Sequence, residues 1–310
     1  MDTIDKRSLV AIHCFVYNHE PYLRDCFEGF VMQQTNFPFV AIVHDDASTD
    51  GSTAIIREYE EKYPHIFKPI YETENQYSKP DGSLNRIMDE AIEATGAKYV
   101  AMCEGDDYWT DPQKLQKQVD FMEANTEYSM CFHKVEVLSH NSNDIGLYDH
   151  LCERAYSAYE IYDKWTIPTC SVLYSRNNLK LLRPKKCLFG DIVLFLSLAN
   201  GGKLFCLDFI GGVYRRHQGG VSTQNNNELY KVLYYQYKEM EMLFPNVREI
   251  SKRKQRDYLS CLIYDKNSVD TWKYRFSYMW LNKKLFFSSF LTTTILSYMI
   301  KPFINKVCNH

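Results

Sequence analysis

The sequence predicts an α/β fold in which helices cover a mostly parallel sheet, with a helical extension at the C-terminus. Three observations support this prediction. Short apolar runs alternate with amphipathic segments through the first half of the chain, which is the pattern of β-α-β units. Polar clusters follow several of these runs, as expected at the carboxyl ends of parallel strands. The chain after residue 225 has helical periodicity and no comparable strand-like runs.

The elements follow from this alternation in chain order. The apolar runs are predicted to form strands at 9–17, 39–44, 67–71 and 99–102. The amphipathic segments are predicted to form helices at 20–34, 52–62, 83–95 and 113–124. Ser52 and Ser83 are candidate N-caps, because a serine hydroxyl accepts a hydrogen bond from a free N–H of the first turn. Gly96 is the expected stop of the third helix, since glycine adopts the left-handed conformation without strain.

The charge distribution indicates two domains. Residues 226–310 contain 14 Lys and Arg against 7 Asp and Glu, whereas the whole chain has a net charge of −3. The part before this segment is therefore acidic, and a polar stretch at 224–227 marks the change. We predict a main α/β domain at 1–225 and a basic helical extension at 226–310. No nucleic-acid partner is expected for an acidic main domain.

Composition and cysteine usage indicate a globular cytoplasmic protein. The 310 residues, with 45% hydrophobic positions, are enough to bury a sizeable core. The N-terminus has no apolar signal core, because the hydrophobic run from Leu9 is broken by His13 and Asn18. The 10 cysteines form no Cys-x-x-Cys pair and mostly lie in apolar runs, so we expect buried thiols in a reducing compartment. These spacings also exclude a structural zinc or iron–sulfur site.

An acidic cluster directly after the predicted strand 99–102 is the strongest functional signal. Glu104, Asp106 and Asp107 are so close that their charges repel, unless a cation lies between them. Hard oxygen ligands suit Mg²⁺ or Mn²⁺, which commonly bridge protein carboxylates to substrate phosphates. A diphosphate ligand is therefore expected. The alternative is a solvated acidic turn that caps the helix beginning near Pro112.

Two further polar clusters follow predicted strands. Residues 17–20 come after the first strand, and residues 45–51 come after the second. One nucleotide could contact all three clusters, because the carboxyl ends of parallel strands meet at one edge of a sheet. The glycine patterns of dinucleotide-binding and P-loop proteins do not occur. Phosphate binding is therefore expected to depend on metal and side chains.

Taken together, these motifs resemble the inverting glycosyltransferases of family 2. The resemblance rests on Val16-Tyr17-Asn18, on the segment 43–52 and on Glu104-Gly105-Asp106-Asp107, and it covers residues 8–220. It implies a GT-A fold and transfer of a sugar from a nucleoside-diphosphate donor, with a UDP-sugar as the expected donor, to an acceptor hydroxyl. It also implies a divalent cation, Mn²⁺ or Mg²⁺, and a role in surface polysaccharide or glycan assembly.

The resemblance assigns donor-binding roles to the first two clusters. Tyr17 would stack on or border the base, with Asn18 beside it, and Asp46 would accept a hydrogen bond from the base edge. Asp45 would support that loop. The alternative is a turn followed by a helix cap, which Asp50 and Ser52 could provide without any ligand.

The third cluster would bind the rest of the donor. Asp106 would contact the ribose, and Asp107 would hold the metal on the diphosphate. Glu104 stands where many relatives have aspartate, so its longer side chain is expected to act from behind the direct ligands. Arg215 and His217 lie in Tyr214-Arg215-Arg216-His217, which resembles the family segment that closes over the diphosphate. Arg215 would bind phosphate, and His217 would reach the metal or a phosphate.

The candidate catalytic base is Asp191, because it matches the place where family members carry their catalytic acid. A sugar hydroxyl is a poor nucleophile until its proton is removed as it attacks. The resemblance therefore implies a single displacement with inversion. An N-terminal helix cap without chemistry is the alternative role of Asp191. Trp109 and Trp165 are candidate acceptor contacts, because aromatic faces suit sugar rings, with core packing as the alternative.

Two other functions remain open at this point. A metal-dependent nucleotidyltransferase would use a similar domain, but it would normally have a basic glycine-rich loop in place of residues 17–21. A non-catalytic nucleotide-sugar binding protein would keep the fold and would not depend on Asp191.

Beyond the main domain, residues 285–300 form an amphipathic segment between lysines, too short to span a membrane. This segment either packs on the protein or lies on the inner face of the membrane, which would suit a lipid-linked glycan acceptor.

Overall fold

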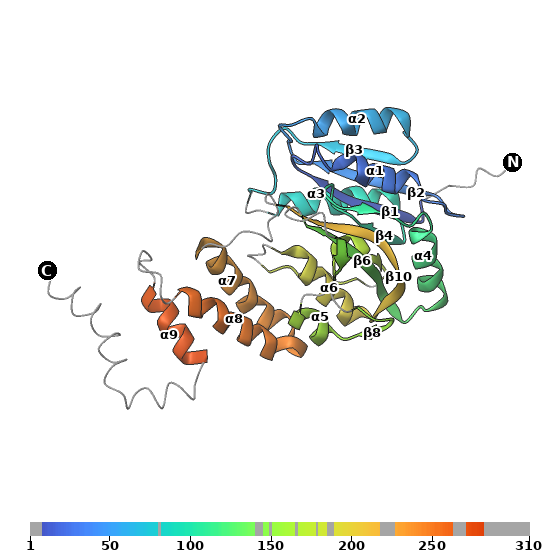
Figure 1. The fold of residues 1–310 in the computed structure, drawn as a ribbon. Helices are drawn as coiled ribbons and strands as arrows, with labels where there is room; N and C mark the ends of the chain where they lie inside the picture. Colours follow the sequence, from blue (N-terminus) through green and yellow to red (C-terminus); the bar gives the residue numbers. More distant parts are fainter. Residues whose placement is uncertain are drawn as a thin grey trace, which may run out of the picture. The chain divides into compact units, whose positions relative to one another are not determined.

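The computed structural model describes residues 8–79, 82–139, 145–148, 151–164, 167–177, 179–184, 189–217, 227–262 and 271–281 (Figure 1). The chain divides into two compact units. The first consists of Met1–Leu181 and Asp191–Gly220, and the second of Leu182–Gly190 and Val221–His310. The division lies close to the charge boundary expected at 225, and the short segment 182–190 is grouped with the C-terminal unit.

The first unit is built on a mixed sheet with a parallel N-terminal half. Strands β1 (Val10–Val16), β2 (Phe39–Asp45), β3 (Phe67–Tyr71) and β4 (Tyr99–Met102) are parallel to their neighbours. Their order in the sheet is β3-β2-β1-β4. Helices α1 (Leu23–Val31), α2 (Ser52–Lys62) and α3 (Ser83–Thr95) connect them. The register pairs Val16 with Asp45, so the loops after β1 and β2 leave the sheet side by side.

The sheet continues with strands of mixed length, which are partly antiparallel. The order after β4 is β9-β6-β10-β5, with β7 and β8 paired at the side of this path. The strands are β5 (Tyr108–Trp109), β6 (Tyr128–Ser139), β7 (Ile145–Leu147), β8 (Arg154–Tyr156), β9 (Leu173–Ser175) and β10 (Lys203–Arg216). Between them lie α4 (Lys114–Ala124), α5 (Ala158–Lys164), the 3-10 turn η1 (Thr169–Ser171) and α6 (Gly190–Gly201).

Alternation along β1 explains how both faces of the sheet are covered. Val10, Ile12, Cys14 and Val16 belong to one apolar cluster with residues of α1 and α2. Successive side chains of a strand point to opposite faces, so the other residues of β1 face away from this cluster. Helix α3 contacts β1 and β2, and buries Met88 and Ile92 outside that cluster. The predicted α/β class, with a largely parallel sheet covered by helices, is thus confirmed.

The sequence placed the first four strands and helices closely, but two predicted caps are wrong. Strand β3 and helices α2 and α3 have the predicted bounds, whereas α1 is shorter at both ends. Ser52 and Ser83 are the first helical residues, and the N-caps are Gly51 and Gly82. The Ser52 hydroxyl has another partner, the backbone N–H of His19. Gly96 ends α3 with φ +66° in the left-handed region, as predicted.

The second unit contains α7 (Asn227–Leu243), the 3-10 turn η3 (Pro245–Val247), α8 (Arg248–Leu262) and α9 (Thr271–Leu281). A small aromatic core of Tyr234, Leu259, Leu262 and Tyr274 holds these helices together. Among the described residues, no helix is both long and apolar enough to cross a membrane. The amphipathic segment predicted at 285–300 lies outside the described residues.

Candidate active site

The loops after β1 and β2 hold each other in an unusual backbone conformation. Asn18 and Ala47 have positive φ angles, +56° and +60°, where a residue other than glycine is strained by roughly 1–2 kcal/mol. Hydrogen bonds between the loops offset this strain. The Asn18 N–H donates to Ser48 Oγ at 3.0 Å, and the Thr49 N–H donates to Asn18 Oδ1 at 2.7 Å. Asn18 therefore acts through its contacts with the neighbouring loop, which the sequence alone did not show.

The next residues continue this reciprocal pairing. The N–H of Glu20 donates to Asp50 Oδ2 at 3.0 Å, and the N–H of Gly51 donates to Glu20 Oε2 at 2.8 Å. A β-carbon on Gly51 would meet the Glu20 carboxyl oxygen at 2.4 Å, so a larger residue would displace this carboxylate. Asp50 Oδ1 also accepts the Ser52 N–H at the start of α2. The two loops thus form one rigid edge beside the acidic cluster.

Asp45 and Asp46 are both buried and hold loops. Asp45 accepts the Ser48 N–H and the Thr53 hydroxyl. Asp46 accepts two backbone N–H groups of the loop after β3, from Gln76 at 2.5 Å and from Tyr77 at 3.0 Å. Asp46 is only 3% exposed, and its carboxylate orders this loop. Its expected contact with the base edge stays a prediction.

Two tyrosines, in contrast, are open at this edge. Tyr17 is 47% exposed, at the end of β1, and Tyr77 is 51% exposed, in the loop that Asp46 holds. The sequence pointed to Tyr17 and missed Tyr77. The sequence signal for Tyr77 was weak, because it is one of 24 tyrosines and lies in an irregular loop. These two rings are the available aromatic surfaces for a base in the described loops after β1 and β3.

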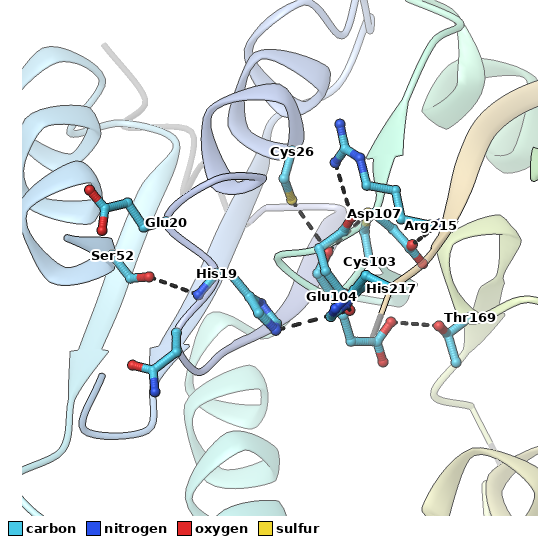
Figure 2. A network of polar contacts seen from close by, with 12 residues as sticks. His19, Glu20, Cys26, Ser52, Cys103, Glu104, Asp107, Thr169, Arg215 and His217 are labelled. Carbon is cyan, nitrogen blue, oxygen red and sulfur yellow. Dashed lines mark hydrogen bonds and ion pairs between the residues drawn. The ribbon is translucent and has the colours of Figure 1, made fainter. Parts of the chain in front are cut away.

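The carboxylate of Asp106 lies between two imidazoles. His217 Nε2 is 2.9 Å from Asp106 Oδ2, and His19 Nε2 is 4.0 Å from the same oxygen (Figure 2). Burial acts to raise the pKa of Asp106, but the hydrogen bond to His217 and the charges of both histidines outweigh it and lower the pKa. Asp106 therefore remains ionised, and the structure brings it together with His217, as the sequence suggested.

His19 is a site residue that the sequence analysis quoted but did not assign. Its Nδ1 is buried and without a hydrogen-bond partner among the described residues. A β-carbon on Gly105 would meet this atom at 2.8 Å, which explains why the acidic motif contains glycine there. Burial lowers the pKa of His19, although the charge of Asp106 raises it. The sequence alone does not identify His19 as a site residue, because its proximity to Asp106 appears only in the folded structure.

Asp107 is fully enclosed behind Asp106. It is 2% exposed, and its Oδ1 accepts the backbone N–H of Arg215 at 2.8 Å. Burial and the charge of Asp106 raise the pKa of Asp107 well above its ordinary value. Without a full counter-charge, these effects disfavour the ionised form of the carboxyl group. A carboxylate in this state gains stability when a cation approaches.

Arg215 fixes the acidic motif from the end of β10. Its guanidinium, which Figure 2 shows beside the acidic motif, donates to the backbone oxygen of Asp106 at 3.0 Å. It also donates to the carboxylate of Asp25. It also lies over the Tyr108 ring, 4.2 Å from the centroid. The side chain is 9% exposed, so Arg215 is a structural clamp as well as a candidate phosphate ligand.

Glu104 and Asp191 form the other side of the cluster. Glu104 accepts the Thr169 hydroxyl at 2.5 Å. The pKa of Glu104 is raised to about 7, mainly by burial and also by the charges of Asp106 and Asp191, against the lowering effect of this hydrogen bond. Asp191 is half-buried in the first turn of α6. Its effect on Glu104 shows that the carboxylate lies within electrostatic range of the acidic motif.

Trp109, one of the two tryptophans proposed for acceptor contact, is a core residue. Trp109 is 2% exposed, its Nε1 donates to the backbone oxygen of Cys170 at 2.8 Å, and its ring contacts Phe30 and Lys114. Its ring faces are therefore enclosed by the core, and Trp109 packs rather than binds a sugar. Trp165 lies outside the described residues.

The chemistry of the cluster fits a divalent cation shared with a ligand. Within the described ranges, no three His, Cys, Asp or Glu side chains are grouped closely enough to hold a metal by themselves. Asp106, Asp107 and His217 nevertheless place carboxylate and imidazole atoms together, and burial, with the neighbouring carboxylates, raises the pKa of Asp107 and Glu104. Carboxylates of this kind commonly hold Mg²⁺ or Mn²⁺ together with substrate phosphates.

A surface hollow of about 560 Å³ lies elsewhere, between the starts of α1 and α2. Its lining includes Glu20, Gly51 and the ion pair of Arg24 with Glu58, but none of the acids after β4. The hollow is therefore separate from the carboxylate cluster. We place the candidate site at the carboxyl ends of β1 and β4, where the charged groups converge.

The chain is similar to known proteins over most of its first unit. The family model described as "Glycosyl transferase family 2" matches residues 12–179. An uncharacterised protein of Mycobacterium tuberculosis, Rv1520, is 36% identical over 215 residues, covering 69% of this chain and 60% of that relative. The "putative teichuronic acid biosynthesis glycosyltransferase TuaG" of Bacillus subtilis is 27% identical over 240 residues, covering 76% of this chain and 90% of that protein.

Solved structures share the fold at low sequence identity. Residues 1–349 of S. aureus TarS in complex with UDP-GlcNAc align with a TM-score of 0.58 at 14% identity, covering 88% of this chain and 79% of that one. The mannosyltransferase PcManGT of Pyrobaculum calidifontis, in complex with GDP-Man and Mn²⁺, aligns with a TM-score of 0.51 at 13% identity. The alignment with PcManGT covers 94% of this chain and 84% of that one. The fold is therefore the GT-A fold.

Proposed function

Because the chain belongs to glycosyl transferase family 2, we propose that it transfers a sugar from a nucleoside-diphosphate sugar to an acceptor hydroxyl, with inversion at the anomeric carbon. The observation that carries the proposal is the acidic motif after β4, in which Asp106 and Asp107 are tied to Arg215 and His217. Two carboxylates, a guanidinium and an imidazole at one sheet edge suit a diphosphate with a cation.

The donor is proposed to lie along the edge formed by the loops after β1, β2 and β4. Tyr17 and Tyr77 present exposed rings for the base, and Asn18 orders the loop beneath them. Asp106 is the ribose contact, and Arg215 is the phosphate contact. A UDP-sugar is the expected donor, which the UDP-GlcNAc complex of TarS supports, while the GDP-Man complex of PcManGT keeps a guanine donor open.

Asp107 and His217 are the residues proposed to hold Mn²⁺ or Mg²⁺. The bound cation would supply charge neutralisation to the diphosphate as it leaves. A cation would stabilise the ionised form of Asp107, since its carboxyl group is buried beside Asp106. Arg215 keeps its backbone N–H on Asp107 and its guanidinium on the Asp106 backbone, so both acids keep their orientation.

Asp191 is proposed as the general base of a single displacement. Its carboxylate accepts the proton of the acceptor hydroxyl while that oxygen bonds to the anomeric carbon. On the opposite face of the sugar, the bond from the anomeric carbon to the diphosphate oxygen breaks, and the electron pair leaves with the diphosphate. Glu104, held by Thr169, stands behind the direct ligands and adds negative charge next to Asp191.

Surface polysaccharide or glycan assembly is the proposed setting, with a glycan or lipid-linked glycan as the acceptor. The name of TuaG, which refers to teichuronic acid biosynthesis, supports this setting. The eight described cysteines, all free thiols, support a cytoplasmic location.

The test is release of nucleoside diphosphate from a panel of UDP- and GDP-sugars, with Mn²⁺, Mg²⁺ or EDTA. We expect one donor to be hydrolysed slowly or transferred to an added acceptor, and this release to stop in EDTA. Metal-dependent nucleotide binding without any release would favour the non-catalytic binding protein. Release of pyrophosphate from a nucleoside triphosphate and a sugar phosphate would favour the nucleotidyltransferase, and absence of nucleotide binding would contradict all three.

We also propose that the C-terminal unit binds anionic membrane surfaces through α9. Tyr274 and Tyr278 face the small aromatic core, whereas Phe276 and Trp280 are 52% and 62% exposed. Lys273 lies on this outer face by helical spacing. A helix face with aromatic and basic residues suits a membrane interface.

Replacement of both Phe276 and Trp280 by serine is therefore expected to lower co-sedimentation with vesicles of phosphatidylcholine and phosphatidylglycerol on the order of tenfold. The matched control is Met242→Ser, which removes another exposed apolar side chain, 68% exposed, from the same unit. Equal binding of both variants, or of anionic and neutral vesicles, would show that α9 has no such role.

A further inference from the structure

Lys114 is the only lysine or arginine in the fully buried set of the described residues. It lies in the first turn of α4 and is 0% exposed. Its ammonium is 4.0 Å from the centroid of the Trp109 ring and donates a hydrogen bond to Gln118 Oε1 at 2.7 Å. Burial lowers the pKa of Lys114 to about 8. Burial of an ammonium group costs free energy of folding, so a lysine at this position needs a physical reason.

Lys114 determines which way the Gln118 amide points. An ammonium is only a donor, so the amide oxygen must face Lys114. The amide nitrogen then faces two backbone oxygens, of Ser171 at 2.9 Å and of Cys131 at 3.5 Å. Gln118 is 0% exposed, and each of its polar atoms has a partner. Lys114 and Gln118 therefore form one unit that holds the backbone of the turn η1.

The turn η1 in turn holds two acids of the candidate site. Thr169 donates its hydroxyl to Glu104, as described above. The Cys170 thiol interacts with the Asp107 carboxyl, and the Cys170 backbone oxygen accepts the Trp109 indole N–H at 2.8 Å. One short turn thus contacts Glu104 and Asp107 from the side of the core. Any shift of η1 would move both carboxylates.

The charge of Lys114 also acts in this region. The thiols of Cys103 and Cys170 lie within electrostatic range of Lys114 on one side and of Asp107 and Glu104 on the other. The buried positive charge of Lys114 therefore lies behind Asp107 and Glu104, separated from them by these two thiols. Such a charge offsets part of the repulsion within the acidic motif.

We propose that Lys114 and Gln118 are positioning residues, which orient Glu104 and Asp107 through the turn Thr169–Ser171. This inference rests on the proposed function for its catalytic consequence, while its structural part stands independently. Neither residue is placed in contact with the donor or acceptor. Their effect passes through η1, so they are expected to act as a pair and to alter the turnover rate more than the folding of the chain.

The test compares Lys114→Met, Gln118→Leu and the double variant with Lys117→Met. Lys117 is the matched control, because it lies on the same helix but forms a surface ion pair with Asp111 at 2.6 Å. Lys114→Met and Gln118→Leu are each expected to lower kcat on the order of 10- to 100-fold, since small displacements of reacting groups are costly. The double variant is expected to have a kcat no lower than that of either single variant, because both substitutions break the same connection to η1. Lys117→Met is expected to keep kcat within about twofold.

Backbone hydrogen exchange supplies a readout that does not need activity. In Lys114→Met, exchange is expected to rise in peptides covering 103–109 and 167–172, and to stay unchanged in Lys117→Met. If the native chain releases no nucleotide, the proposed function fails while this readout still decides the positioning role. If Lys114→Met does not fold, kcat and backbone hydrogen exchange are measured for Gln118→Leu and for the near-isosteric Thr169→Val. Native exchange together with native kcat in a folded variant would overturn the inference.

Discussion

Replacement of Asp191 by asparagine is expected to lower sugar transfer by roughly 10²- to 10⁴-fold, the usual effect of removing a general base. Asparagine has nearly the same size as aspartate and still accepts hydrogen bonds, so the start of α6 should be kept. The amide cannot take the proton of the acceptor hydroxyl. We expect kcat to fall while the affinity for the nucleotide stays the same, measured by calorimetry with UDP and Mn²⁺.

The matched control for this variant is Asp208→Asn, in the same unit. Asp208 lies in β10, is largely exposed and pairs with Lys134, so its removal should change stability by no more than about 1 kcal/mol. A rate for Asp191→Asn within a few-fold of the native rate would assign Asp191 to helix capping. Loss of nucleotide affinity in this variant would instead place Asp191 at the donor.

The second large effect is expected from Asp107→Asn. The asparagine oxygen can still accept the Arg215 N–H, so the connection between the acidic motif and β10 should survive. The variant lacks the negative charge that would hold the cation on the diphosphate. We expect the affinity for UDP in the presence of Mn²⁺ to fall roughly 10²-fold, as for loss of a charge-assisted contact in a buried site. Binding of UDP in EDTA should change little.

Asp120→Asn serves as the control for Asp107→Asn, because Asp120 is exposed on α4 and accepts a hydrogen bond from Gln116. The informative quantity is the difference between affinities measured with Mn²⁺ and with EDTA. This difference should vanish in Asp107→Asn and persist in Asp120→Asn. An unchanged metal effect in Asp107→Asn would remove Asp107 from the proposed metal site.

Much of the fold follows from local patterns in the chain. The apolar runs that became β1 to β4 have the length and composition of buried strands, and the helices α2 and α3 have the predicted bounds. The predicted N-caps were wrong, since Ser52 accepts the His19 N–H of a neighbouring loop in place of capping α2. Competition of this kind between local and distant partners cannot be seen from one segment alone.

The site could be located, but its individual roles could not all be assigned. Glu104, Asp106 and Asp107 were conspicuous because three acids follow one strand within four positions. His19, Tyr77 and Lys114 were not, since their importance depends on what lies opposite them. Trp109 was misjudged for the same reason. An aromatic residue next to an acidic motif can face solvent or core, and only the position of Phe30 and Lys114 shows which.

The sequence by itself determined the alternation of strands and helices, the location of the acidic motif at a strand end and the family of the chain. These properties depend on short-range periodicity and on side-chain chemistry at fixed spacing. Only the tertiary structure decided that Asp46 turns into the loop after β3, that Arg215 meets Asp25 and Asp106, and that Lys114 is buried behind the acids. Such contacts join residues far apart in the chain, so they arise from packing of the sheet and its helices rather than from any local pattern.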